Sequence, residues 1–245
     1  MTENSTMKQK TALVTGANKG IGYEIAAGLA RLGFRVGVGA RDTARRNEAV
    51  EKLRDDGLNV FGVPLDVTDD VSVAAAAALL DDEGGLDVLV NNAAITGGTP
   101  QEPSRVSPEQ VLRVVDTNVL GVIRVPNAML PMLRRAESPR IVNVSSTVGS
   151  LTLQTAQAEA VGPISAAYSP SKTFLNAVTV QYAKELADTS ILVNAGCPGY
   201  VSTDLNGHRG TRTPEQGAAI FLELATLPDD GPNGTFRDDA GTQPW

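Results

Sequence analysis

A glycine-rich turn near the start of the chain constrains the fold more than any other feature. The apolar run at residues 12–14 leads into T-G-A-N-K-G-I-G, and an amphipathic helical stretch follows at residues 20–32. Glycines at a strand-to-helix turn let a phosphate approach the amides at the helix N-terminus, where the dipole favours an anion. The segment predicts a phosphate-binding turn for a dinucleotide, with contacts from Gly16, Asn18, Lys19, Gly20, Ile21 and Gly22.

The same alternation of strand and helix continues along the chain. Strands that recur between helices of ten or more residues indicate βαβ units and a parallel sheet. The strands are continuous apolar runs, which is typical of a sheet covered on both faces. Right-handed crossovers then predict an α/β fold of the Rossmann type, a doubly wound sheet of about seven strands with helices on both faces. The expected strands are 12–14, 35–38, 59–63, 86–90, 141–144 and 191–193, and the first helices are 20–32, 43–55 and 71–80.

No shift in composition and no flexible linker divides the 245 residues. We therefore expect one domain over residues 10–245, preceded by a loose tail at residues 1–9. The net charge of −7 argues against a nucleic-acid partner. Cys197 is the single cysteine, the first ten residues lack an apolar signal core, and residues 71–80 are too short to span a bilayer. We expect a cytoplasmic protein that contacts no membrane.

What the chain lacks excludes several enzyme classes. With His208 and Cys197 as the only residues of their types, a zinc site would consist mostly of carboxylates, so no metal site is predicted. The sequence contains neither a G-x-S-x-G motif nor a G-x-x-x-x-G-K-[ST] loop. We interpret His208 as a solvated loop residue and Cys197 as a small buried one.

Motifs along nearly the whole chain resemble those of the short-chain dehydrogenase/reductase family. T-G-x-x-x-G-x-G is followed by N-N-A-A at residues 91–94, D-T-N-V-x-G around Asn118, I-V-N-V-S-S ending at Ser146, and Y-x-x-x-K from Tyr168 to Lys172. The T-G-A-N-K-G-I-G turn, the Ala40-Arg41 pair and the final G-P-N-G-T-F…W are most similar to the carbonyl reductase branch. The resemblance implies further cofactor contacts from Asp66, Val67, Asn92, Ala93, Tyr168, Lys172, Pro198, Gly199, Val201 and Thr203.

The end of the second strand bears on the choice between NADP(H) and NAD. An NAD enzyme usually places an acid there to bind the ribose 2′-hydroxyl, whereas this chain has Ala40 followed by Arg41. A guanidinium can bind the 2′-phosphate of NADP(H), and Lys19 adds a second positive charge. We interpret the competing acid, Asp42, as a helix N-cap and Arg45 and Arg46 as solvated helix residues.

Tyr168 and Lys172 are four residues apart, so a helix places them on one face. Pro170 is tolerated in a first turn, which predicts that the helix begins close to Tyr168. Free tyrosine titrates at about 10. A nearby ammonium and an oxidised nicotinamide would lower that pKa and make Tyr168 an acid/base group. The resemblance implies that Lys172 also holds the cofactor ribose, that Ser146 rather than Ser145 stabilises the substrate oxygen, and that Asn118 anchors a water.

The predicted activity is NADPH-dependent reduction of a small ketone or aldehyde, with Asn118, Ser146, Tyr168 and Lys172 as catalytic residues. Two alternatives stay open: an NAD-linked alcohol or diol dehydrogenase, and a non-catalytic NADP(H)-binding redox sensor. Residues 147–167 and 200–213 follow strand ends, so we expect them to shape the substrate pocket. The intermediate length of the first segment leaves monomer, dimer and tetramer open.

Overall fold

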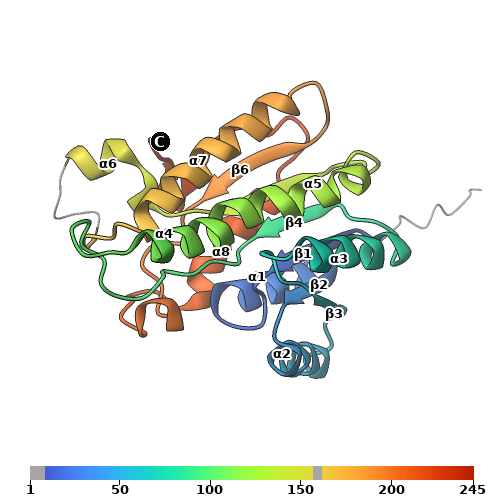
Figure 1. Ribbon diagram of the computed structural model, residues 1–245. Helices are drawn as coiled ribbons and strands as arrows, with labels where there is room; N and C mark the ends of the chain where they lie inside the picture. Colours follow the sequence, from blue (N-terminus) through green and yellow to red (C-terminus); the bar gives the residue numbers. More distant parts are fainter. Residues whose placement is uncertain (1–8, 157–161) are drawn as a thin grey trace, which may run out of the picture.

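Eight strands form one sheet in the computed structural model, which describes residues 9–156 and 162–245 (Figure 1). The strand order is β3-β2-β1-β4-β5-β6-β7-β8. The first seven strands are parallel, and β8 adds a short antiparallel pair to β7, so the sheet exceeds the predicted seven by one strand. The strands are β1 Thr11–Thr15, β2 Arg35–Ala40, β3 Val60–Pro64, β4 Val88–Asn91, β5 Arg140–Val144, β6 Leu192–Gly196, β7 Phe236–Asp238 and β8 Gly241–Thr242.

Helices cover both faces of the sheet, as the apolar strands predicted. Neighbouring residues of β1 point to opposite layers, with Val14 packed in one apolar cluster and Leu13 in the other. The first cluster contains side chains of α1, α2 and α8, and the second contains side chains of α3, α5 and α7. The helices are α1 Gly20–Arg31, α2 Thr43–Asp55, α3 Asp70–Asp82, α4 Pro108–Val115, α5 Gly121–Leu133, α6 Leu151–Ala156, α7 Tyr168–Glu185 and α8 Pro214–Ala225.

Three short elements complete the chain: a π-helical turn η1 (Asp116–Leu120) and the 3-10 turns η2 (Thr147–Gly149) and η3 (Asp204–Asn206). The π-helical turn joins α4 to α5 without a break.

Most long helices begin with a polar side chain that accepts a bond from a first-turn amide. Asp42 does this for α2, which confirms its prediction as an N-cap, and Asp69, Ser107 and Thr213 do it for α3, α4 and α8. Helices α1 and α7 differ, because the side chains of their N-cap residues, Lys19 and Ala167, accept no such bond from the described residues. Both of these helices carry predicted site residues.

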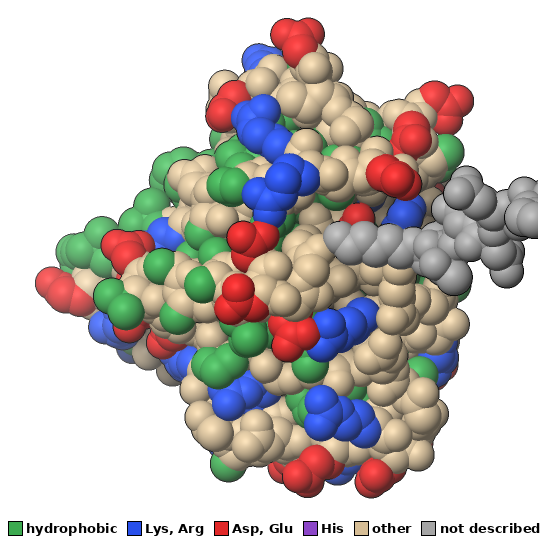
Figure 2. Space-filling model, turned by 90° about the vertical axis from the view of Figure 1, so that its right-hand side faces the viewer, with side chains coloured by type: hydrophobic (Ala, Val, Ile, Leu, Met, Phe, Trp, Pro, Cys, Tyr) green, Lys and Arg blue, Asp and Glu red, His purple; other side chains and the backbone are tan. Residues whose placement is uncertain are grey.

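The predicted tail at residues 1–9 lies outside the described residues except for Gln9. The Gln9 side chain donates to the Gly33 carbonyl and accepts from Asn59. Acidic and basic side chains intermix over the face shown in Figure 2. No helix within residues 9–156 and 162–245 has the length and apolar character needed to cross a bilayer.

Candidate active site

The carboxyl ends of the parallel strands meet at one edge of the sheet, and the predicted site residues follow these ends. The strand order reverses between β1 and β4, because the chain moves outward to β3 and then returns to the other side of β1. Such a reversal opens a crevice at the strand ends, where ligands bind in folds of this kind. The residues that follow the strand ends are Gly16 after β1, Arg41 after β2, Asp66 after β3, Asn92 after β4, Ser146 after β5 and Pro198 after β6.

The glycine turn packs closely against the end of β4. A Cβ on Gly22 would lie 2.4 Å from the Asn92 Nδ2 atom, and one on Gly16 would lie 2.9 Å from the Ala93 Cα atom. The Asn92 side chain donates to the carbonyls of Thr15 and Gly16, at 2.8 and 3.1 Å. Asn92 and Ala93 therefore hold the turn at the edge of the sheet, and the contact admits only glycine at these two positions.

The amides at the start of α1 fit an anion. Those of Gly20, Ile21 and Gly22 have no hydrogen-bond acceptor among the described residues, and the N-cap residue Lys19 provides no side-chain cap. Free amides aligned with a helix dipole are the groups that a pyrophosphate needs. The adjoining Asn18 is half-buried in the same turn. This turn can hold the diphosphate of a dinucleotide.

The two predicted 2′-phosphate ligands each face a carboxylate. Lys19 Nζ lies 2.5 Å from an Asp204 oxygen, and Arg41 Nη1 lies 4.0 Å from an Asp66 oxygen. Partial burial opposes ionisation of Asp66, but bonds from Thr68 and the Arg41 charge hold its pKa below the usual value. The pairs keep both cations beside the crevice. The Val67 side chain, also predicted to meet the cofactor, is buried against α5.

The interpretation of Arg46 as a solvated residue is wrong. Arg45 is exposed and pairs with Asp42, as expected for a helix surface. Arg46 is buried on the inner face of α2, where its guanidinium donates to the Ala40 carbonyl at 3.1 Å. The long Arg46 side chain reaches the Ala40 carbonyl, which also accepts from the Leu65 amide, so the buried guanidinium keeps a hydrogen-bond partner.

The segment after β6 approaches the glycine turn from the other side. A Cβ on Gly20 would touch the Thr203 side chain at 3.4 Å. Val201 is buried and forms a β-bridge with Arg212, which fixes the segment that begins at Pro198 and Gly199. Of the predicted contacts in this segment, Thr203 therefore lies against the glycine turn.

Tyr168 begins α7, and Lys172 lies one turn further along the same face, as predicted. The Lys172 Nζ atom is 5.6 Å from the centroid of the Tyr168 ring and donates to the Val144 carbonyl at 2.7 Å. A Cβ on Gly149 would lie 2.7 Å from the Lys172 backbone carbon, so the turn after Ser146 packs against the same part of α7. Tyrosine, lysine and serine thus converge at the end of β5.

The expected fall in the pKa of Tyr168 is not produced by the protein's own groups. Loss of solvent, and secondly the Cys197 thiol, raise the pKa of the Tyr168 phenol. Burial lowers the pKa of Lys172 to about 8. Lys172 does not lower the Tyr168 pKa as expected because it is itself desolvated and directs its ammonium to a backbone carbonyl.

The two serines after β5 have different surroundings. Ser145 is buried and its hydroxyl donates to Asn176 of α7, while the amide of that asparagine side chain has no partner among the described atoms. Ser146 is half-buried, and its hydroxyl accepts a long bond, 3.4 Å, from the Val148 amide. The Ser145 hydroxyl is therefore engaged in the protein interior, whereas the Ser146 hydroxyl is free to donate to a substrate.

Asn118 is buried in the π-helical turn, and its side chain is fully engaged. The Asn118 amide group exchanges two bonds of 2.9 Å with the backbone of Ile95 and donates to Ser171 Oγ at 3.0 Å. Ser171 Oγ in turn donates to the Tyr168 carbonyl at 2.6 Å. The Asn118 side chain thus joins the β4 loop to the first turn of α7, and the π-helical turn is the helix irregularity that holds it.

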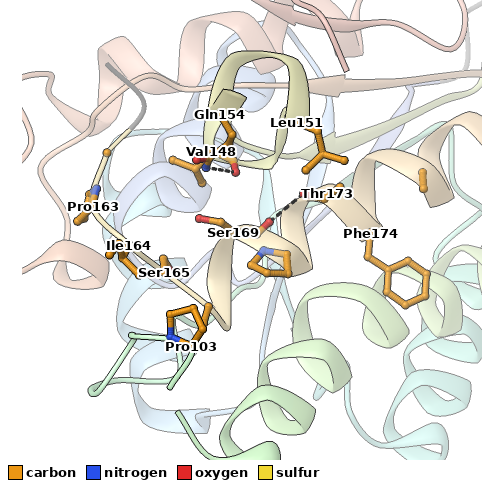
Figure 3. Close-up of a pocket in the computed structure, with 14 residues that line it drawn as sticks. Pro103, Val148, Leu151, Gln154, Pro163, Ile164, Ser165, Ser169, Thr173 and Phe174 are labelled. Carbon is orange, nitrogen blue, oxygen red and sulfur yellow. Dashed lines mark hydrogen bonds between the residues drawn. The ribbon is translucent and has the colours of Figure 1, made fainter. Parts of the chain in front are cut away.

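A cavity of about 670 Å³ lies beside the first turns of α7 (Figure 3). One wall consists of Ser169, Thr173 and Phe174 on α7, while Val148, Leu151 and Gln154 and residues 162–166 line other parts of the cavity. The predicted pocket segment 147–167 thus contributes to a cavity, although residues 157–161 lie outside the described part of the chain. Tyr168 and Lys172 do not line it, because they lie on another face of α7.

Three other positions complete the site description. Cys197 is buried, as predicted, and contacts Thr147. His208 is exposed, as predicted, but its Nε2 atom lies 2.8 Å from an Asp204 oxygen.

Sequence analysis missed Gln101, which bonds to the residues before Tyr168, and the sequence pattern around it carries no signal of that role. Residues 9–156 and 162–245 contain no group of three or more His, Cys, Asp or Glu side chains placed to hold a metal.

Known proteins resemble this chain over nearly its whole length. The family model described as short chain dehydrogenase matches residues 10–213. Carbonyl reductase (NADPH) 1 of Rattus norvegicus is 34% identical over 276 residues, covering 96% of this chain and 98% of that protein. Salutaridine reductase of Papaver bracteatum is 33% identical over 300 residues, covering 96% of each. The solved structure of salutaridine reductase from Papaver somniferum has a TM-score of 0.82 at 33% identity and covers 93% of this chain and 99% of that one.

A doubly wound sheet, an open phosphate turn and a tyrosine-lysine pair at the strand ends define an oxidoreductase that acts on small molecules. The chain belongs to the short-chain dehydrogenase/reductase family, in its carbonyl reductase-like branch, as the motifs indicated.

Proposed function

We propose that this enzyme uses NADPH to reduce the carbonyl group of a ketone or aldehyde to an alcohol. The observation that carries the proposal is the placement of Tyr168 and Lys172 on one face of α7, beside the turn that follows Ser146. The relatives named carbonyl reductase (NADPH) support the choice of cofactor and reaction. Arg41 and Lys19, at the strand edge where a 2′-phosphate would lie, support the same choice.

The cofactor contacts divide into two groups in this proposal. The amides of residues 20–22 hold the diphosphate, while Arg41 and Lys19 bind the 2′-phosphate and Asp66 and Val67 meet the adenine. The residues after β4 and β6 would hold the nicotinamide half; they are Asn92, Ala93, Pro198, Gly199, Val201 and Thr203. When bound, NADPH supplies the hydride that reduces the carbonyl carbon.

The chain's own residues manage the proton and the developing charge. Tyr168 donates its phenolic proton to the carbonyl oxygen, which acquires negative charge as the bond order falls. Ser146 donates a hydrogen bond to the same oxygen and stabilises that charge. The Lys172 ammonium favours the phenolate that is left behind and binds the ribose hydroxyls. The phenolate regains its proton from the Lys172 ammonium, and a water that Asn118 would position returns a proton to Lys172.

The raised pKa of Tyr168 fits the reductive direction. A phenol must be protonated to act as an acid, and loss of solvent keeps Tyr168 protonated through the physiological range. The oxidative direction needs a phenolate, and the protein alone disfavours it.

Oxidation of NADPH should be measured against a panel of aldehydes, α-diketones, quinones and β-ketoesters, with NADH in parallel. We expect turnover on part of the panel and a higher kcat/KM for NADPH. A clear preference for NADH, with faster oxidation of alcohols, would support an NAD-linked dehydrogenase. Tight NADPH binding with no turnover on any compound would support a redox sensor instead.

A further inference from the structure

The residues that precede Tyr168 are held by the loop between β4 and α4. Gln101 Oε1 accepts a bond from the Ala167 amide at 3.2 Å and from the Ser165 hydroxyl at 3.1 Å. The Gln101 backbone carbonyl accepts from the Ala166 amide at 2.9 Å. Three consecutive residues before the catalytic tyrosine therefore depend on one residue that is 67 positions away in sequence from Tyr168.

The Gln101 side chain is in turn fixed by its own loop. Its Nε2 atom donates to the carbonyls of Thr96, at 2.9 Å, and Gly98. Thr96 follows Ile95, whose backbone is held on both sides by Asn118. The acceptor half of the Gln101 amide thus faces α7 and the donor half faces the loop, so the side chain bridges two rigid elements.

At the start of α7, the Ser169 amide donates to the backbone carbonyl of Ser165, a residue that Gln101 holds. The N-cap residue of this helix is Ala167, which has no side chain able to accept from the first-turn amides. The opposite side of the turn is held by Asn118 through Ser171. We propose that Gln101 is a positioning residue for catalysis: its side-chain oxygen holds the N-terminus of α7 so that the Tyr168 hydroxyl keeps its place opposite Ser146. The inference rests on the proposed function of Tyr168.

The chain offers a matched control in Gln110. The buried Gln110 side chain donates to the carbonyls of Gly98 and Pro100, at 3.3 and 2.9 Å, in the same loop. In contrast to Gln101, its contacts are all within that loop and α4. Gln110→Met therefore disturbs the loop without removing an acceptor from α7.

The test compares Gln101→Met, Gln101→Glu and Gln110→Met in the full-length enzyme. Gln101→Met keeps the length of the side chain but loses both halves of the amide. Gln101→Glu keeps an oxygen that can accept from Ala167 and Ser165, and it replaces the donor half by an oxygen that faces the carbonyls of Thr96 and Gly98. The measurements are kcat and KM for the best carbonyl substrate, the Kd of NADPH, and hydrogen exchange of the amides at residues 165–169 without cofactor.

We expect Gln101→Met to lower kcat about tenfold to a hundredfold, since small misplacements of reacting groups have effects of this size. The KM and the NADPH Kd should change less than about twofold, because most of the proposed cofactor contacts lie on elements other than α7. Exchange at residues 165–169 should accelerate. Gln101→Glu should recover part of the kcat that Gln101→Met loses, and Gln110→Met should stay within about twofold of wild type.

Equal kcat losses in Gln101→Met and Gln110→Met, or no recovery in Gln101→Glu, would overturn the inference. So would unchanged exchange at residues 165–169 in Gln101→Met. The exchange measurement needs no turnover, so an enzyme that reduces nothing would contradict the proposed function while leaving the contact of Gln101 open to its own test.

Discussion

Helices α1 and α7 both begin at the active-site edge without a side-chain cap, but their N-termini are held in different ways. At α1, the amides of residues 20–22 have no acceptor in the described protein, and cationic Lys19 and Arg41 stand nearby. At α7, Gln101 accepts from the amide of the N-cap residue Ala167, and Asn118 of η1 donates to Ser171 in the first turn. We call the start of α1, with its free amides, the open end. We call the start of α7, which other elements hold by hydrogen bonds, the tied end.

The difference matches the role proposed for each terminus. A helix end that binds an anion must leave its amides free, because the ligand itself supplies the cap. A helix end that carries an acid/base group must keep that group in register with a substrate, so the protein supplies the constraint. Changes at the two ends should therefore alter different kinetic constants.

The largest expected effect is a loss of kcat at the tied end with the NADPH Kd unchanged. Tyr168→Phe removes the phenolic proton donor and keeps the ring, so kcat should fall by about 10² to 10⁴. The NADPH Kd, measured by calorimetry, should stay close to that of wild type. Turnover near the wild-type rate would remove Tyr168 from the mechanism.

The open end should show the reverse pattern. Arg41→Ala removes a guanidinium from the 2′-phosphate position, which should raise the KM for NADPH about tenfold to a hundredfold. The KM for NADH and the kcat should change little. Lys52→Ala, which removes an exposed cation further along α2, serves as the control. Equal losses with both cofactors would show that Arg41 does not read the phosphate.

The pH dependence of kcat/KM tests the tied end separately from the open end, because Lys172 lies near the start of α7. Burial lowers the pKa of Lys172 to about 8, so the ammonium is lost as the pH rises through that value. Reduction requires the ammonium, and kcat/KM for NADPH should therefore fall about tenfold per pH unit above about 8. Tyr168, with its raised pKa, stays protonated there and cannot cause the fall. A flat profile up to pH 10 would contradict this assignment.

The smallest expected effect concerns the exposed pair at the open end. Asp204→Asn releases Lys19 from its carboxylate partner and frees the ammonium for the 2′-phosphate. The KM for NADPH should fall about twofold to fivefold, the range for exposed ion pairs. His208→Asn removes the other partner of Asp204 and should leave this KM unchanged. A higher KM in Asp204→Asn would mean that Asp204 helps to bind the cofactor.

Much of the fold and the outline of the site could be predicted from the sequence. The sheet with helices on both faces, the start of α7 at Tyr168 and the Asp42 cap follow from local patterns, namely apolar periodicity, proline tolerance and capping preference. The residues after the strand ends converge because all parallel strands end at one edge. Their binding and catalytic roles remain predictions that the variants above test.

Local patterns failed where a side chain's environment depends on distant residues. Arg46 resembles any helix-surface arginine in sequence, and only the packing of α2 on the sheet buries it beside the Ala40 carbonyl. The spacing of Tyr168 and Lys172 suggested a lowered phenol pKa, but burial of the phenol raises that pKa, and burial of Lys172 lowers the pKa of the lysine.

The sequence by itself determined which residues stand at the strand ends and which helix carries the tyrosine, because these depend on short-range periodicity and on motifs. Only the tertiary structure decided which serine has a free hydroxyl, which carboxylate faces Lys19, and that Gln101 holds the start of α7. Those contacts join residues tens of positions apart, and their energies depend on distance and solvent exposure, which no local pattern records.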